Sequence, residues 1–272
     1  MLSPDFQFDW TLAAECEFSG LGLHSGQFSK LRVLPSQTPG IFVLSENKPQ
    51  RISVSQVTST QYCTCLAFPD FQIQTVEHLL AALWGAGISS ALLVLEGSEV
   101  PILDGSAQPF LERFIQVGRK QLPSLRAVFQ PKAGQWGHQE AWIRWQPAEK
   151  LSLHYTVDYA GPPALQQSYD FEFEPLAFQQ KIAPARTFVY RREVEALWQA
   201  GLAQGGSQEN ALVIEEQISQ PDWRFQNEPV RHKILDLLGD LVLAGEFPLA
   251  RIEAFRTGHQ AHVTMVKLWS GS

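Results

Sequence analysis

Residues 231–241, with the sequence RHKILDLLGDL, restrict the fold more than any other stretch of the chain. Predicted as a helix, this stretch places His232, Asp236 and Asp240 at positions i, i+4 and i+8, where their side chains share one stripe. Most of the other residues are Leu or Ile, which would draw the helix into a core. Two buried carboxylates beside an imidazole are costly there unless a metal ion or another partner compensates them. The alternative is the solvent face of an amphipathic helix, which fits the stretch better when it is considered alone.

Two shorter motifs also carry groups capable of chemistry. Glu77 and His78 are adjacent at the start of a predicted helix over residues 75–84, for which Thr75 is a good N-cap. Both side chains could face one cavity; alternatively, Glu77 interacts with the helix dipole and His78 is packed in the core. His259 follows a glycine in a predicted loop, where a lone histidine is usually a surface residue.

The whole sequence alternates between strand-like and helix-like patterns, which predicts the α+β class. A polar, proline-broken stretch at residues 118–124 separates residues 1–122 from residues 123–272, which we expect to be two domains. Predicted strands occupy residues 41–44, 52–55, 91–95, 142–145, 151–158 and 169–173, and predicted helices occupy residues 75–84, 106–117, 192–200 and 230–243.

Charge and cysteine content argue against several classes of protein. The 272-residue chain has a net charge of -7, which disfavours a nucleic-acid partner because phosphate binding needs clustered Lys and Arg. Its three cysteines form neither an even disulfide set nor a CxxC pair, as expected in the reducing cytoplasm, and residues 1–5 show no export signal.

Residues 79–95 carry no charge, but Gly85 and Gly87 divide them into a predicted helix and strand, so no membrane span is expected. GxGxxG, Walker A, HExxH and GxSxG motifs are absent from the sequence.

Six blocks, in the same order along the chain, resemble one family, the UDP-3-O-acyl-N-acetylglucosamine deacetylases (LpxC). The blocks are GLHSG at 22–26, TVEHL at 75–79, VPILDGS at 100–106, ARTF at 185–188, the helix at 232–240 and the GH pair at 258–259. The resemblance covers nearly the whole chain and therefore outweighs the separate interpretations of single motifs. It implies two similar layers, each a sheet on helices, packed face to face with the active site between them, and an insertion near residues 188–213.

The resemblance also implies a zinc-dependent hydrolysis with three protein ligands to Zn²⁺, namely His78, His232 and Asp236. Such a donor set leaves a fourth position for water, as in catalytic rather than structural zinc sites. Glu77 would be the general base that takes a proton from water. His259 would protonate the leaving amine, with Asp240 holding its ring. Thr187 and Lys233 would help to stabilise the negative oxygen of the tetrahedral intermediate.

The substrate that the resemblance implies is UDP-3-O-(3-hydroxyacyl)-N-acetylglucosamine, whose deacetylation releases acetate in lipid A biosynthesis. Tyr159 would stack on uracil, and Arg256 with Lys233 would meet phosphate. An apolar passage would hold the acyl chain, for which each buried CH₂ is worth about 0.8 kcal/mol. The further substrate-binding residues that we expect are Phe188, Val194, Ala203, Gly206, Val213 and Cys63.

Two other functions stay open at this point. A non-catalytic module could bind acylated sugars or lipid, although it would have no use for both Glu77 and His259. Another zinc amidohydrolase could act on a different acylated amine, which the metal donors alone do not exclude. After the GH pair the family usually continues toward Leu-Asn, whereas this chain has Gln260-Ala261-His262, so the local geometry of the loop is open. We expect a monomer without stable membrane insertion; the sequence does not determine the preferred chain length or the metal held in cells.

Overall fold

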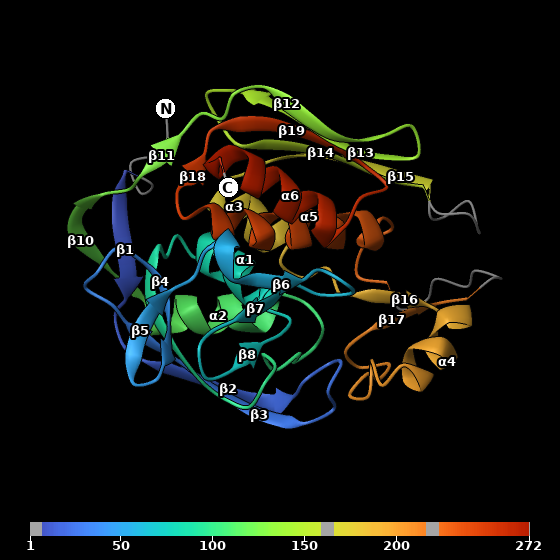
Figure 1. Cartoon of the computed structure of the whole chain (residues 1–272), viewed down its shortest axis with the longest axis horizontal. Coiled ribbons are helices and arrows are strands. Elements are labelled where there is room, and N and C mark those ends of the chain that lie inside the picture. The colour runs from blue at the N-terminus through green and yellow to red at the C-terminus, as the bar shows by residue number, and fades with distance from the viewer. Residues whose placement is uncertain (1–6, 159–165, 216–222, 272) are drawn as a thin grey trace.

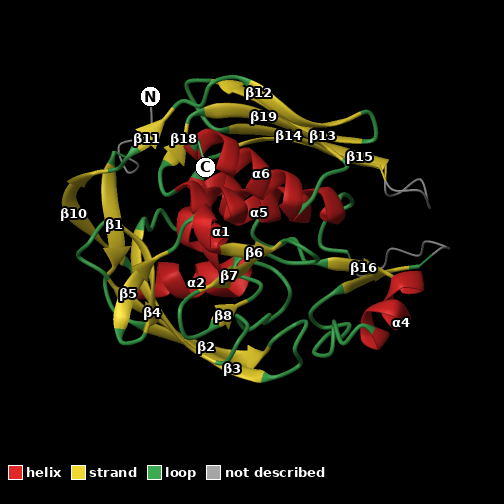
Figure 2. Ribbon diagram, viewed as in Figure 1, coloured by secondary structure: helices red, strands yellow, loops and turns green. Residues whose placement is uncertain are grey.

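The computed structural model describes residues 7–158, 166–215 and 223–271, in which two main sheets enclose a layer of helices (Figures 1 and 2). The helices are α1 (Glu77–Gly85), α2 (Gln108–Val117), α3 (Pro175–Lys181), α4 (Arg191–Gln199), α5 (Glu228–Leu241) and α6 (His259–Ser270), with 3-10 turns η2 (Val54–Gln56) and η4 (Val242–Ala244). This mixture of sheets and helices confirms the predicted α+β class. None of the helices in these ranges is long and apolar enough to cross a membrane.

The larger sheet contains seven strands: β1 (Phe8–Leu12), β2 (Cys16–Leu21), β3 (Phe28–Pro35), β4 (Gly40–Ser45), β5 (Lys48–Arg51), β9 (Ser90–Glu96) and β10 (Arg119–Leu125). Its order is β10-β1-β9-β3-β2, with β4 pairing with both β9 and β5. Strand β10 runs through the predicted domain boundary at residue 122 and pairs antiparallel with β1. The division into residues 1–122 and 123–272 stays a prediction.

The second sheet contains five strands in the order β12-β13-β19-β14-β15. Their bounds are β12 (Gly134–His138), β13 (Ala141–Pro147), β14 (Ser152–Asp158), β15 (Gln166–Glu172) and β19 (Ala250–Phe255). In β14 the side chains of Leu153, Tyr155 and Val157 are buried and alternate with more exposed neighbours, the pattern of a strand with one face on a core. This face lies over α5 and α6 (Figure 1).

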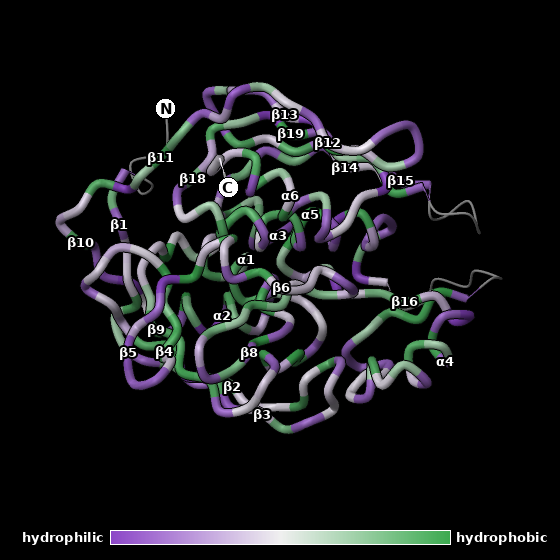
Figure 3. The backbone as a smooth tube through the Cα atoms, in the orientation of Figure 1, coloured by the Kyte–Doolittle hydropathy of each residue, from purple (hydrophilic) through white to green (hydrophobic). Residues whose placement is uncertain are grey.

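The smaller pairings are β6 (Val57–Ser59), β7 (Cys65–Ala67) and β8 (Gln72–Ile73) in one sheet, β11 (Val128–Phe129) with β18 (Phe247–Pro248), and β16 (Phe188–Tyr190) with β17 (Leu212–Ile214). One hydrophobic core joins residues of both main sheets and of the helices between them. Helix α1 is hydrophobic along most of its length, whereas the turn from β12 to β13 is hydrophilic (Figure 3).

Three local predictions are wrong. Residues 52–55 are not a strand, because the Ser53 backbone N–H donates to Gln56 Oε1 (2.9 Å) and residues 54–56 form η2. Thr75 does not cap α1: its φ is 58° and its hydroxyl donates to Glu99 Oε1 (2.7 Å). His259 does not lie in a loop, because it is the first residue of α6.

Candidate active site

Three buried side chains of types that can ligate a metal ion meet between α1 and α5. His78 is the second residue of α1, and His232 and Asp236 stand one turn apart on α5. The Asp236 Oδ1 atom lies 3.2 Å from His232 Nε2 and 3.7 Å from His78 Nε2, and one ligand atom of each residue lies within 4.8 Å of the others. The stripe on α5 therefore faces a site between helices and is not a solvent face.

The chemistry of these three donors fits a bound cation. His232 Nδ1 lies 3.0 Å from the carbonyl oxygen of Ala185, which only accepts, so Nδ1 carries the ring proton and Nε2 presents a lone pair. Asp236 Oδ1, which faces that lone pair, is buried and has no hydrogen-bond partner among the described residues. Ligands about 2.0–2.1 Å from a tetrahedral zinc ion would be about 3.3 Å apart, close to the separations found. Electron-pair donors gathered without protons between them are unfavourable unless a cation joins them.

The close approach of α1 and α5 depends on Gly239. A Cβ atom at this position would lie 2.1 Å from the backbone oxygen of Glu77 and 2.8 Å from its Cα. Any larger residue would push the start of α1 away from α5, and with it the side chains of Glu77 and His78. The glycine in the 231–241 motif thus has a packing reason that local sequence alone does not reveal.

Glu77 and His259 face each other next to Asp236. His259 Nε2 lies 3.8 Å from Glu77 Oε1 and 3.9 Å from Asp236 Oδ2, and its Nδ1 lies 2.8 Å from Asp240 Oδ2. Thr64, which the sequence analysis did not single out, links the two sides: its N–H donates to Glu77 Oε2 (3.2 Å) and its hydroxyl to Asp240 Oδ1 (2.6 Å). A proton acceptor and a proton donor therefore face one small space.

Burial and neighbouring charges together raise the pKa values of Glu77 and His259. Burial raises the pKa of Glu77 above its ordinary value, which makes this carboxylate a stronger base. Burial opposes the charge on His259, but the carboxylates of Asp240, Glu77 and Asp236 outweigh it and raise its pKa to about 10.

Two further predicted catalytic residues, Lys233 and Thr187, and the predicted phosphate contact Arg256 lie at the rim of the donor set. Lys233 Nζ donates to Asp236 Oδ2 (2.8 Å), and Thr187 and Arg256 line the same cavity. Arg186 forms a buried ion pair with Glu228 on α5, with 3.0 Å between Nε and Oε1. This pair holds the segment whose Ala185 carbonyl fixes the His232 ring. The roles of Lys233, Thr187 and Arg256 stay predictions.

A cavity of about 510 Å³ opens from the donors, and a second, more apolar cavity of about 330 Å³ adjoins it. Both are lined by Leu23, His24, Tyr62, Thr187, Phe188 and Glu193, so the two cavities are neighbours. All five predicted passage residues line the apolar part: Phe188, Val194, Ala203, Gly206 and Val213. Cys63 is buried with its Sγ 3.6 Å from Cys65 Sγ and does not line either cavity, and Tyr159 lies outside the described residues.

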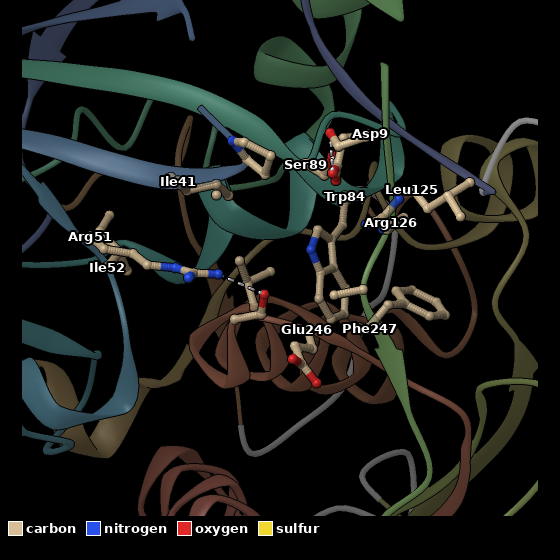
Figure 4. Close-up of a pocket in the computed structure, with 16 residues that line it drawn as sticks. Asp9, Ile41, Arg51, Ile52, Trp84, Ser89, Leu125, Arg126, Glu246 and Phe247 are labelled. Atoms are coloured by element: carbon tan, nitrogen blue, oxygen red, sulfur yellow. Dashed lines mark hydrogen bonds between the residues drawn. The ribbon is translucent and has the colours of Figure 1, made fainter. Parts of the chain in front are cut away.

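A separate cavity of about 280 Å³ lies elsewhere, where residues of β1, β4, β5 and β18 meet (Figure 4). Several of its polar groups are engaged within the protein: Asp9 accepts hydrogen bonds from Ser89 and Ser124, and Arg51 donates to the Gly245 carbonyl. Arg126 packs over the ring of Phe247. The residues that line it include no histidine or cysteine, so the metal donors and the acid–base pair single out the cavity between α1 and α5.

Together the fold and this site define an α+β protein with a buried two-histidine, one-aspartate donor set and a flanking acid–base pair. A model of the family described as "UDP-3-O-acyl N-acetylglycosamine deacetylase" matches residues 9–269. Proteins named UDP-3-O-acyl-N-acetylglucosamine deacetylase from Nostoc sp. and Thermosynechococcus vestitus are 38% and 40% identical to this chain, in each case over 94% of it and over 96% and 92% of their own lengths. The one from Anaeromyxobacter dehalogenans is 37% identical over 94% of this chain and 85% of its own. The chain belongs to the UDP-3-O-acyl-N-acetylglucosamine deacetylase family.

Proposed function

We propose that this protein hydrolyses the N-acetyl group of UDP-3-O-(3-hydroxyacyl)-N-acetylglucosamine, a step of lipid A biosynthesis, and that it does so with zinc held by His78, His232 and Asp236. The observation that carries the proposal is the convergence of these three donors beside Glu77 and His259. The free thiols of the described cysteines agree with a cytoplasmic enzyme. The names of the relatives support the substrate.

The acid–base steps follow from the positions of Glu77 and His259. When bound, zinc supplies Lewis acidity toward water and toward the amide carbonyl. Glu77 accepts the proton that water loses as its oxygen bonds to the acetyl carbon. His259 gives the proton on Nε2 to the amide nitrogen as the carbon–nitrogen bond breaks, so that acetate and the amine leave. The hydrogen bond from His259 Nδ1 to Asp240 keeps Nε2 directed at the cavity.

The residues at the rim support binding and charge stabilisation. Lys233 and Thr187 line the cavity, where they would stabilise the negative charge that develops on the carbonyl oxygen. Arg256 lines the same cavity and would meet phosphate. The apolar cavity beside Phe188 would take the acyl chain, in accord with its lining of Val194, Leu197 and Val213.

A non-catalytic binding module is less consistent with this arrangement. A buried glutamate and histidine 3.8 Å apart cost folding free energy, because both charges lose their hydration. A module that only binds its ligand would gain no function from this pair. A zinc amidohydrolase with another acylated amine as substrate would use the same donors, so the substrate has to be tested directly.

The test is acetate release by the purified zinc-loaded protein from the acylated nucleotide-sugar, with the same nucleotide-sugar lacking the acyl chain as control. We expect efficient release from the first substrate and weak release from the second. Equal rates on both would contradict the acyl passage, and no release from either would reject the proposed reaction.

A further inference from the structure

His262 is a buried histidine that the proposed mechanism does not use. It stands three residues after His259 on α6, so both side chains leave the first turns of that helix toward Asp240 on α5. His262 has no exposed surface, and neither does Asp240. Its position follows the point where the sequence departs from the usual pattern of the family.

One oxygen of Asp240 serves both histidines. Asp240 Oδ2 lies 2.8 Å from His259 Nδ1 and 2.9 Å from His262 Nδ1, while Oδ1 accepts the Thr64 hydroxyl. A carboxylate only accepts hydrogen bonds, so each Nδ1 carries a proton and each ring turns its Nε2 away from Asp240. His259 Nε2 thereby points to the cavity and His262 Nε2 points to the opposite side.

The far side of the His262 ring rests on the second sheet. The hydroxyl of Tyr155, a buried residue of β14, lies 3.2 Å from His262 Nε2 and 2.8 Å from the backbone oxygen of Thr257. Thr257 precedes His259 by two residues. His262 therefore connects three parts of the structure around His259: the carboxylate on α5, the strand β14 and the turn that leads into His259.

We propose that His262 is a positioning residue that acts through Asp240: its Nδ1–H holds the carboxylate in the orientation that directs His259 Nε2 into the cavity. The inference rests on the proposed function, in which His259 protonates the leaving amine. His262 is not one of the three candidate metal ligands on α1 and α5, and it does not itself line the cavity. Its loss should therefore lower turnover without weakening substrate binding.

Three substitutions separate this role from simple packing. In His262→Asn the side-chain NH₂ takes the place of Nδ1 and still donates to Asp240. In His262→Gln the NH₂ lies one bond further out, near the place of Nε2, and no longer meets Asp240. His262→Leu keeps much of the volume and removes both contacts. Asn and Gln carry the same amide group and differ by one CH₂, so the two variants differ mainly in where the NH₂ lies.

We expect kcat to fall roughly tenfold to a hundredfold in His262→Leu and His262→Gln, which is the range for losing a hydrogen bond to a buried charge, with KM and zinc content unchanged. His262→Asn should retain kcat within about threefold of the original. Equal losses in the Asn and Gln variants, or full activity in the Leu variant, would overturn the inference. If the Leu variant does not fold, the Asn and Gln pair still decides it.

A second readout does not depend on activity. In protein labelled with ¹⁵N at histidine, the Nδ1–H of His259 should give a downfield proton resonance, because it donates to a buried carboxylate. This signal should persist in His262→Asn and shift or broaden in His262→Gln. An unchanged signal in the Gln variant would overturn the role of His262. A wild-type protein that shows the signal but releases no acetate would instead reject the proposed function.

Discussion

The three candidate metal ligands come from two helices packed at the centre of the molecule, whereas the 188–213 segment lies at its edge around β16, β17 and α4 (Figure 1). His78, His232 and Asp236 are 2–3% exposed and lie within the shared core. Tyr190 of the edge segment forms a small separate cluster with Ile214, which directly follows the segment, and Leu197 is the only buried residue of α4. The function of the central region depends on the exact positions of a few atoms, which long-range packing fixes. The function of the edge segment depends on the amount of apolar surface. We therefore expect single substitutions at the centre to cause large losses of zinc affinity or kcat, and changes at the edge to alter kcat/KM gradually.

The largest effect that this comparison predicts is on metal binding. His78→Ala removes the donor that α1 contributes, so zinc affinity should fall by more than the roughly 10- to 100-fold typical of losing a group that supports a ligand. Activity should be lost with the metal. Zinc content after dialysis, measured beside the rate of acetate release, checks this; a variant that keeps one zinc per chain would break the assignment of His78.

The next effect separates the base from the ligands. Glu77→Gln keeps the shape and the acceptor for Thr64 but removes the basic carboxylate, so kcat should fall by about 10²- to 10⁴-fold while zinc stays bound. Single-turnover rates and metal analysis on the same sample measure both. Normal turnover in this variant would show that another group takes the proton from water.

At the edge of the molecule the expected response is gradual. Each CH₂ removed from the acyl chain should cost about 0.8 kcal/mol, so shortening it by two carbons should lower kcat/KM by roughly tenfold. Val213→Phe, which fills part of the apolar cavity, should move the optimum toward shorter chains. A series of substrates that differ only in chain length measures this, and a flat response would remove the passage from the proposed function.

The last prediction concerns stability rather than activity, at the helix contact that joins α1 and α5. Replacing a helical glycine by alanine normally stabilises a helix by about 1 kcal/mol. In Gly239→Ala the new methyl group would meet the backbone of Glu77, so we expect net destabilisation of about 1–3 kcal/mol and a lower Tm. Gly20→Ala, where the nearest side-chain atom is 3.7 Å away, is the control and should change Tm little.

Local patterns were sufficient for the elements whose periodicity depends on near neighbours. The helices at residues 108–117, 191–199 and 228–241 and the strands at residues 90–96, 141–147 and 152–158 lie close to their predicted positions. Helix α6 was missed because its first turn follows a glycine and carries two histidines, which read as a loop. Thr75 was misread because its hydroxyl has a better partner in Glu99, 24 residues away.

The sequence by itself determined that His232 and Asp236 share one side of a helix and that Glu77 adjoins His78, because both relations depend only on the geometry of a single turn. Only the tertiary structure decided that these two helices meet at Gly239, that their polar residues face a cavity, and that Asp240 serves His262 as well as His259. Such meetings depend on the packing of side chains far apart in the chain. Spacing along the chain carries no information about that packing, because the same stripe of residues would suit solvent equally well.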